Sequence, residues 1–391
     1  MKDPQKNLDV ETKAGYKVPF GTVSITDEAR KLIDEALNTK FVTRGKLVER
    51  FEKEFAALFG VKEAVAVSSG TDADALSLAV LYDYGAKRGD EIIIPALSFI
   101  ATGNAVFQAG FTPKFVDVKR ETLNIDTAKI EKAITPRTKG IMPVHLMGKP
   151  ADMDAVMGIA KKHKLFVVED AAEAHGAEYK GKLVGTFGDI AAFSLYAAHI
   201  VTTIEGGIAI TNDPKKAESL RSLRNHGMVN KFNFERIGFS AKMNEIEAAV
   251  GIGNIRIFHD ILNKRRRNLL YLIDNFSRFE EFLITIREEE NEKIGPHAFS
   301  VILREEVPFT KGECVDYLDA QGVDSRNLFY SMPTQCPSYS FLGHKLGEFP
   351  EAEYCGDQGF HIGIHQDIEI DQLDHVVGVM TEFLKKKGIR V

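Results

Sequence analysis

The sequence of 391 residues contains no tryptophan and only three cysteines, Cys314, Cys336 and Cys355. The cysteines stand far apart, without a CxxC pair or an even-numbered set, so they indicate neither a structural zinc site nor a disulfide framework, and we expect no metal site. Charge of one sign is not in excess either, because 50 Lys and Arg stand against 56 Asp and Glu. With a net charge of −6, the chain is a poor candidate for non-specific nucleic-acid binding, which requires surplus basic charge.

Long apolar runs are also missing. The most apolar stretch, residues 92–118, is interrupted by Pro95, Asn104, Gln108 and Pro113, and it predicts two buried strands around a helix instead of a membrane span. The N-terminal sequence MKDPQKNLDVETKAG is polar and lacks the apolar core of a signal peptide. We therefore expect a cytoplasmic protein that binds neither membrane nor nucleic acid.

Short apolar runs alternate with helical patterns over the first 250 residues. Several runs are apolar at consecutive positions, which is typical of strands buried on both faces of a parallel sheet. The expected strands are 64–67, 91–96, 114–118, 140–145, 165–169, 190–195 and 206–210. This series predicts an α/β fold with a mostly parallel seven-stranded sheet and helices on both faces. In such sheets the functional side chains follow the carboxyl ends of the strands.

The pattern changes near Asn244. Asn244 with Glu247 three residues later predicts a helix N-terminus, and the helix continues toward Phe276 with an expected break at Gly251 or Gly253. The elements expected after it are a strand (298–303), a helix (311–321), a proline-rich loop (331–337) and a final helix (372–387).

These elements divide the chain into two expected domains. Residues 1–254 comprise an N-terminal segment and a large α/β domain, and residues 255–391 form a smaller α+β domain. The basic run 264–267 falls inside the long helix and is interpreted as a solvated helix face.

Three groups of polar residues follow predicted strands. The segment 68–73 (SSGTDA) opens a helix, where hydroxyls and backbone N–H groups can hold a phosphate, although an ordinary capped turn has the same pattern. Asp170 ends a buried strand, where an acid can bind a metal or a protonated ring nitrogen, or cap the next helix. The loop after Ser194 contains one histidine, His199, at a place where function concentrates in α/β folds.

In these segments the sequence resembles the DegT/DnrJ/EryC1/StrS family of sugar aminotransferases. That family depends on pyridoxal 5′-phosphate (PLP) and has the PLP-dependent transferase fold of type I. The resemblance extends over nearly the whole chain, and it rests on ordered motifs at 69–73 (SGTDA), 95–102 (PALSFIAT), 143–154 (PVHLMGKPADMD), 169–176 (EDAAEAHG), 202–207 (TTIEGG) and 238–251 (GFSAKMNEIEAAVG).

The resemblance implies a role for each matching residue. Asp170 should pair with the pyridinium nitrogen, Glu173 should face the ring hydroxyl, and Phe99 should stack on the ring. The residues expected to hold the phosphate are Gly70, Thr71, Ser194 and, from the neighbouring subunit of a homodimer with shared sites, Ser240. The expected substrate contacts are Lys242 and His226, although His226 fits an ordinary exposed loop histidine equally well.

One position departs from the family pattern. His199 stands where the family has the lysine that forms a Schiff base with PLP, and an imidazole forms no stable imine. This substitution resembles the dehydratase branch of the family, which acts on nucleotide-linked 4-keto-6-deoxyhexoses. The resemblance implies that pyridoxamine 5′-phosphate (PMP) supplies the amine, that the sugar loses its C3 hydroxyl, and that glutamate regenerates PMP. His199 would be the catalytic residue, since imidazole suits proton transfer near neutral pH.

Two other interpretations stay open. The chain can be an aminotransferase variant whose lysine has been replaced, or a PLP-fold protein without catalysis that serves as a regulator or binding partner. Against the second, Thr71, Phe99, Asp170 and Ser194 are all present.

The cysteine count also separates two types of dehydratase, because one type carries a [2Fe–2S] cluster and works with a reductase. Such a cluster needs four Cys ligands, or Cys together with His, and three dispersed cysteines do not supply them. We predict that anaerobically purified protein contains no stoichiometric iron or acid-labile sulfide and needs no reductase. Finding both elements in stoichiometric amounts would contradict the cluster-free assignment.

Overall fold

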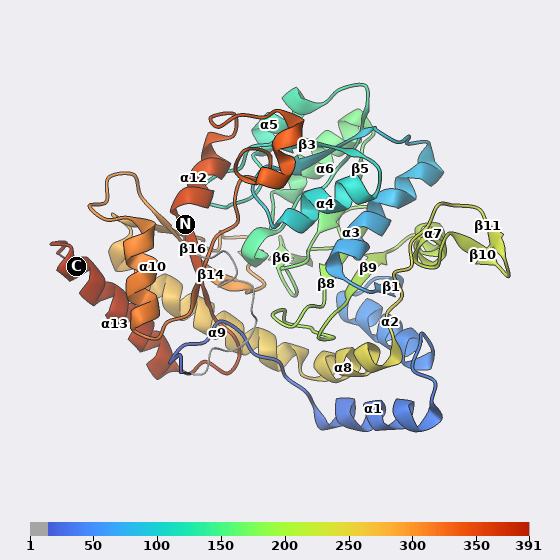
Figure 1. The fold of residues 1–391 in the computed structure, drawn as a ribbon, viewed down its shortest axis with the longest axis horizontal. Coiled ribbons are helices and arrows are strands. Elements are labelled where there is room, and N and C mark those ends of the chain that lie inside the picture. The colour runs from blue at the N-terminus through green and yellow to red at the C-terminus, as the bar shows by residue number, and fades with distance from the viewer. Residues whose placement is uncertain (1–14, 391) are drawn as a thin grey trace.

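The computed structural model describes residues 15–390, and a seven-stranded sheet lies at its centre (Figure 1). In sheet order the strands are β1 (Glu63–Val67), β9 (Gly207–Thr211), β8 (Ile190–Ser194), β5 (Phe166–Asp170), β4 (Thr138–Ile141), β2 (Glu91–Pro95) and β3 (Thr112–Val116). β9 runs antiparallel to both of its neighbours, and the other pairs are parallel. All seven expected strands are present with ends shifted by a few residues, so the predicted α/β class is confirmed.

Helices cover both faces of this sheet because alternate residues of each strand point to opposite sides. The helices are α1 (Asp27–Thr39), α2 (Lys46–Phe59), α3 (Gly70–Ala79), α4 (Ile100–Gln108), α5 (Thr127–Ala133), α6 (Met153–His163), α7 (Pro214–Arg224) and α8 (Glu245–Arg256), with 3₁₀ turns η2 (Val80–Tyr84) and η3 (Leu146–Gly148). On one face, Ala64 and Ala66 of β1 share a core with α2, α6 and α8. On the other face, Val65 and Val67 pack with α3 and α7.

The C-terminal part is built around a four-stranded antiparallel sheet. Its order is β12 (Leu283–Thr285), β14 (Ala298–Leu303), β16 (Gly359–Gly363) and β15 (Ser325–Asn327). Its helices are α9 (Phe258–Phe276), η4 (Ser277–Phe279), α10 (Lys311–Ala320), α11 (Met332–Gln335), η5 (Pro337–Leu342), α12 (Pro350–Gln358) and α13 (Ile370–Lys386). Phe299 and Val301 of β14 belong to the same apolar cluster as Ile92 and Val168 of the large sheet, so one core runs through both parts.

Two small sheets complete the structure. β13 (Glu292–Lys293), β6 (Glu178–Tyr179) and β7 (Lys182–Leu183) form one of them, and β10 (Met228–Asn230) with β11 (Asn233–Phe234) forms a hairpin. Figure 1 shows this hairpin extending beyond the body of the molecule next to α7.

The expected break of the long helix at a glycine is wrong. Asn244 does begin α8 with a full capping box to Glu247, but the helix continues through both glycines and ends at Arg256. A Cβ on Gly251 would lie 2.5 Å from the Phe51 ring, and one on Gly253 would lie 2.3 Å from the Thr26 hydroxyl. The glycines therefore allow α8 to pack closely on α2 and α1, and the chain bends at residue 257 instead.

Two further expectations need correction. The segment 331–337 is not a plain loop, because α11 lies within it and accommodates Pro333 in its first turn, where no intrahelical N–H is required. The basic run 264–267 is only partly a solvated face, because Lys264 and Arg267 are exposed and the other two residues are not. Arg265 is almost fully buried, and Arg266 pairs with Glu288.

The N-terminal segment contacts the C-terminal part. Val18 pairs with Val323 in a parallel bridge, and the Val18 N–H donates to the Gly322 carbonyl at 3.0 Å. Residues 1–14, from which we expected no signal peptide, lie outside the described residues. We propose that the domain division lies between residues 254 and 255. In the described part of the chain no helix combines the length and apolar character that a membrane crossing needs.

Candidate active site

Most of the expected site residues meet at the carboxyl-terminal edge of the large sheet. Gly70 follows β1, Phe99 follows β2, Asp170 ends β5 and Ser194 ends β8. These four strands run in the same direction, so their ends lie along one edge. The sheet thus brings together side chains that are up to 124 positions apart in the chain.

The loop after β1 begins α3 with a close turn. The Ser69 hydroxyl accepts from the Asp72 N–H at 3.0 Å and caps the helix. A Cβ on Gly70 would lie 2.7 Å from the Cβ of Ser194, so only glycine lets these two segments approach. The first-turn N–H groups of Gly70 and Thr71 have no partner within the helix, and a helix N-terminus attracts anions. The loop is therefore a capped turn whose first backbone N–H groups are available to an anion.

Asp170 is a buried carboxylate in a hydrogen-bonded setting. Its Oδ2 accepts from the Thr102 hydroxyl at 2.8 Å, which in turn contacts the Ser98 hydroxyl at 2.7 Å. Its Oδ1 accepts from the Ala172 N–H at 3.2 Å. Burial raises the pKa of Asp170, and the Thr102 hydrogen bond opposes this shift. Because Asp170 is the last residue of β5 and no helix follows directly, the helix-cap interpretation is excluded.

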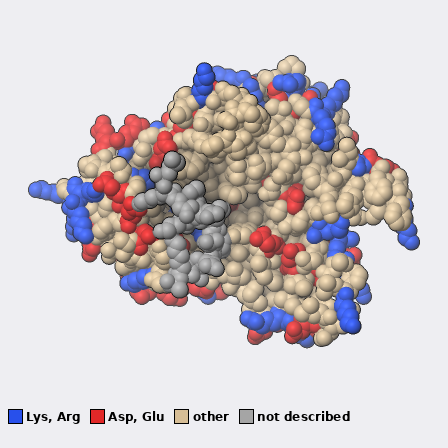
Figure 2. Space-filling view, in the orientation of Figure 1, with Lys and Arg blue, Asp and Glu red and all other residues tan. Residues whose placement is uncertain are grey.

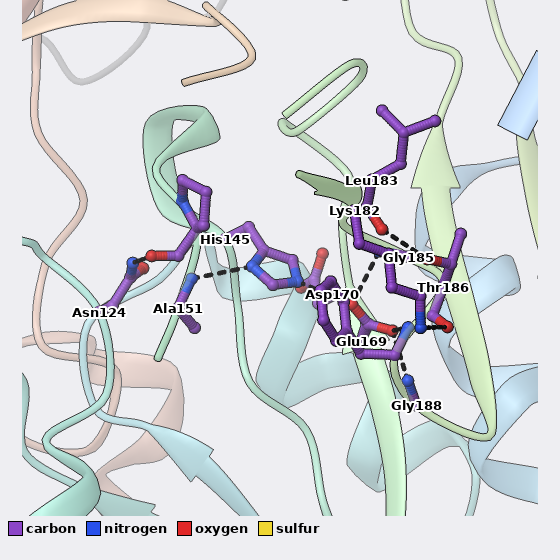
Figure 3. A network of polar contacts seen from close by, with 12 residues as sticks. Asn124, His145, Ala151, Glu169, Asp170, Lys182, Leu183, Gly185, Thr186 and Gly188 are labelled. Carbon is purple, nitrogen blue, oxygen red and sulfur yellow. Dashed lines mark hydrogen bonds and ion pairs between the residues drawn. The ribbon is translucent and has the colours of Figure 1, made fainter. Parts of the chain in front are cut away.

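The neighbouring residue, Glu169, holds this strand end in place. Its side chain is fully buried and accepts from the backbone N–H groups of Gly185, Phe187 and Gly188 at 2.6–2.7 Å. Figure 3 shows His145 lying between Ala151 and Glu169. The Ala151 N–H donates to His145 Nδ1 at 3.0 Å, so the imidazole proton is on Nε2, 3.2 Å from Glu169 Oε2.

His199 lies in the loop after β8, close to two other imidazoles. Its ring centroid is 5.0 Å from that of His297 and 5.8 Å from that of His175. His199 Nδ1 is closed to solvent and has no hydrogen-bond partner among the described residues. Burial, with a smaller contribution from the Arg265 charge, lowers the pKa of His199 to about 3. The imidazole is therefore neutral at pH 7.

Arg265 lies next to the His199 loop, and Glu173 lies next to His297. Arg265 Nη1 donates to the Ala198 carbonyl at 3.0 Å, which fixes the loop next to His199. Glu173 Oε2 accepts from the Met147 N–H at 2.7 Å, and Glu173 Oε1 lies 3.5 Å from His297 Nε2. Burial raises the pKa of Glu173 to about 8, so its carboxyl group is largely protonated at pH 7.

The remaining predicted residues are exposed. Phe99 is 56% exposed and offers its ring at the sheet edge, next to Phe329 at 5.5 Å between centroids. Ser240, Lys242 and His226 are also exposed. Residue 242 pairs with Val67 at the end of β1, and the Ala241 carbonyl accepts from the Ser68 N–H at 3.2 Å, whereas the His226 N–H donates to the Phe239 carbonyl at 2.8 Å. The structure does not bring these three side chains to His199.

Sequence reasoning missed three residues that contact the site. Thr102 lies inside the motif 95–102, and its position one helical turn after Ser98 was an available signal. Arg265 was hidden in a basic run, and His297 stands alone before a strand of the C-terminal part. A lone histidine far along the chain gives no local indication that it faces the loop after β8.

The charged residues on the face shown in Figure 2 do not indicate a nucleic-acid-binding site. In Figure 2 most Lys and Arg residues lie toward the outline of the molecule, and Asp and Glu residues lie among them and in a small group near the middle of the face. A nucleic-acid surface would need a continuous basic area.

The chain is similar to known sugar-modifying proteins over most of its length. The profile of the "DegT/DnrJ/EryC1/StrS aminotransferase family" matches residues 23–381. A GDP-perosamine synthase of Caulobacter vibrioides is 37% identical, with 91% of this chain and 95% of the relative covered. A GDP-4-keto-6-deoxy-D-mannose 3-dehydratase of Yersinia pseudotuberculosis is 31% identical, with 93% and 99% covered.

Solved structures give the same picture. A GDP-4-keto-6-deoxymannose-3-dehydratase "with a trapped PLP-glutamate geminal diamine" superposes with a TM-score of 0.85 at 29% identity, and the match covers 93% of this chain and all of that one. The similar proteins thus include both a synthase named for an amino sugar and 3-dehydratases.

Asp74 is a second buried carboxyl group near Asp170. It lies in α3 with 3% exposure, and its Oδ1 has no hydrogen-bond partner among the described residues. Burial raises the pKa of Asp74 well above its ordinary value, and the Asp170 charge adds to the shift. A raised folded-state pKa means that stability is greatest below the ordinary pKa of 3.8 and falls as the pH rises toward the folded-state value.

We predict that Asp74→Asn raises the free energy of unfolding at pH 8 relative to wild type by about 1–3 kcal/mol, the usual cost of an unpaired buried polar group. The gain should shrink at pH 3, below the ordinary pKa of 3.8, where Asp74 is protonated in the folded state and mostly protonated in the unfolded state. Urea unfolding of cofactor-free protein at both pH values measures the difference. Asp260→Asn, on an exposed side chain, is the matched control and should change stability by less than about 0.5 kcal/mol. An equal gain at both pH values would disprove the ionisation account.

Proposed function

Because this chain belongs to the DegT/DnrJ/EryC1/StrS aminotransferase family, we propose that it is a PLP/PMP-dependent 3-dehydratase of a nucleotide-linked 4-keto-6-deoxyhexose. The product is the 3,6-dideoxy-4-keto sugar, and glutamate regenerates PMP. The observation that carries this proposal is His199, an imidazole at the position where the family has its Schiff-base lysine. We further propose that the enzyme is cytoplasmic.

The residues present fit a phosphorylated pyridine cofactor. The close approach of Gly70 to Ser194 forms an anion cradle at the start of α3, and the buried Asp170 lies on the same sheet edge as Phe99. In this arrangement Gly70, Thr71 and Ser194 would hold the phosphate. Asp170 would keep a proton at the ring nitrogen, and Phe99 and Glu173 would contact the ring.

When bound, PMP supplies the amine that condenses with the sugar ketone and the ring that takes up electrons. The chain's own catalytic contribution is proton transfer by His199. Neutral at pH 7, its imidazole can accept a proton from the reacting carbon and return it to the departing C3 hydroxyl. Arg265 keeps the loop in place through the Ala198 carbonyl. Lys242 and His226 are exposed and are proposed to contact the sugar nucleotide.

A panel of GDP-, CDP-, dTDP- and UDP-linked 4-keto-6-deoxyhexoses tests this function. For each sugar deoxygenated at C3, the balanced reaction converts one glutamate to 2-oxoglutarate and releases one ammonia. We predict that mass spectrometry detects the 3-deoxy sugar with ammonia and 2-oxoglutarate in equal amounts. Transamination, which the similarity to GDP-perosamine synthase favours as the second candidate, gives an amino sugar and 2-oxoglutarate without ammonia. A catalytically inert protein gives neither.

His199 variants serve as the controls of this experiment. His199→Asn should keep PMP affinity through Asp170 and the phosphate contacts but lose at least about 100-fold in rate, the scale of general acid–base assistance. Borohydride treatment of PLP-loaded wild type should leave no pyridoxyl label on the protein, whereas His199→Lys should be labelled. A fully labelled wild type, or a His199→Asn variant with near-normal turnover, would refute the role of His199.

We also propose a homodimer with shared sites. The hairpin β10–β11 and the residues after it expose large apolar side chains: Val229 is 37% exposed, Phe232 87%, Phe234 55% and Ile237 80%. An apolar surface of this kind on a projecting element suits contact with a second copy of the chain. Ser240 and Lys242 lie just after it and are exposed, so they are available to the neighbouring subunit.

A mixed dimer tests shared sites. One chain carries His199→Asn and the other carries Ser240→Ala with Lys242→Ala, and each homodimer should be inactive. If each site combines residues of both subunits, the mixed dimer regains one intact site and about half of the wild-type activity. Activity of purified, tag-verified mixed dimers measures this. No recovery in those dimers, or full activity of a verified monomer, would contradict shared sites.

A further inference from the structure

Three histidines lie next to one another between the large sheet and the C-terminal part. The His199 ring lies between those of His297 and His175, at centroid separations of 5.0 and 5.8 Å. Each of the three has one ring nitrogen that is closed to solvent and has no hydrogen-bond partner among the described residues: Nδ1 of His199, Nδ1 of His297 and Nε2 of His175. Burying a ring nitrogen without a hydrogen-bond partner costs free energy of folding, so this cluster points to a function for the three histidines.

Two glycines fix the position of His297. The Gly295 N–H donates to the Gly148 carbonyl at 3.0 Å. A Cβ on Gly148, whose φ is +79°, would lie 1.7 Å from the Gly295 carbonyl oxygen, and a Cβ on Gly295 would lie 2.6 Å from the His175 carbonyl oxygen. Only glycines allow this approach, which places His297 against both Glu173 and His199.

The setting of His199 creates a problem for proton transfer. Burial and the positive charge of Arg265 keep its pKa near 3, so a doubly protonated imidazole is strongly disfavoured at pH 7. A base that accepts a proton at Nε2 under these conditions must release the proton on Nδ1. The ring next to it, His297, presents an unpartnered Nδ1 of its own.

Glu173 can receive the released proton at the other end of His297. Its Oε1 lies 3.5 Å from His297 Nε2, and its pKa of about 8 lets the carboxyl group gain or lose a proton near neutral pH. His297 itself stays neutral, because burial lowers its pKa well below the ordinary value and the neighbouring His199, His361, Arg265 and His175 act in the same direction.

We propose that Glu173, His297 and His199 form a proton relay. When His199 accepts a proton at Nε2, its Nδ1 proton passes to His297 Nδ1, and the His297 Nε2 proton passes to Glu173. The reverse sequence returns one proton to the leaving C3 hydroxyl, so the proton count balances and no imidazolium forms. The two ring centroids lie 5.0 Å apart and neither Nδ1 has a hydrogen-bond partner among the described residues, so the relay requires a ring rotation within the broad χ2 well that brings the two Nδ1 atoms into contact. His297 is thus a positioning and relay residue, and the catalytic consequence rests on the function proposed above.

The relay couples the ionisation of Glu173 to the tautomer of His199. Protonated Glu173 donates to His297 Nε2, His297 Nδ1–H donates to His199 Nδ1, and His199 carries its proton on Nε2, the acid form. Ionised Glu173 accepts from His297 instead, and His199 then carries its proton on Nδ1 and presents Nε2 as a base. Between pH 6 and 9.5 Arg265, with a pKa of about 10, stays mainly charged, and His175 and His361 stay neutral.

Nitrogen-15 NMR of cofactor-free, histidine-labelled protein tests the relay without catalysis. The His199 signals are assigned by their loss in His199→Asn. Between pH 6 and 9.5 we expect the proton of His199 to move from Nε2 to Nδ1 with a midpoint near 8, the pKa of Glu173. In Glu173→Gln the amide donates to His297 at every pH, so His199 should remain in the Nε2–H form. His297→Phe should abolish the pH-dependent change.

His175→Gln is the matched control, because His175 also adjoins His199 but does not contact Glu173 in this scheme, and the change should persist in it. A wild type without the change, or a Glu173→Gln variant that retains it, would overturn the relay; the latter result would assign the titration to another group, such as Asp170. In the active enzyme, His297→Phe should lower kcat, by up to about 100-fold, with little change in KM.

The two proposals fail in different ways. If the tautomer change occurs as described but no sugar nucleotide is dehydrated, the relay stands and the proposed function falls. If dehydration is demonstrated while His199 keeps one tautomer throughout the titration, the function stands and the relay is refuted.

Discussion

The position of the active site depends on one buried carboxylate, Glu169. A charge in the protein interior is unfavourable unless its hydrogen-bonding capacity is met, and here three backbone N–H groups and the His145 imidazole meet it. These contacts join the end of β5 to residues 185–188 and to the segment after β4. This network fixes the backbone of Asp170, the next residue in the chain, and so keeps the Asp170 side chain at the sheet edge.

The sequence revealed the large sheet well because its strands are buried on both faces and read as continuous apolar runs. It also revealed the capping box of Asn244, which depends on local contacts alone. It failed where a residue's role depends on a distant segment. Gly251 was predicted to break the helix because the residue that explains it, Phe51, lies 200 positions away and cannot be recognised from the local sequence. Arg265 was predicted to be solvated because the oxygens that accept its hydrogen bonds belong to Ala198 and Gln366, in other segments.

The candidate site shows the same limit. Asp170, Gly70 and Ser194 follow strands, so strand order alone brought them together. His297 reaches the loop after β8 through glycine contacts that no local pattern encodes. The large sheet thus supplies the groups proposed to hold the cofactor, and the C-terminal part supplies the residue that completes the surroundings of His199.

The apolar cluster that contains both Val168 and Phe299 affects how the protein unfolds. Residues of the large sheet and of the C-terminal sheet lose their contacts with one another if either part unfolds, and α9 contributes side chains to both cores. The two topological parts are therefore not two thermodynamic units. Heating should melt them together in one cooperative transition, and the candidate site residues drawn from the two parts would lose their alignment at the same temperature as the fold itself.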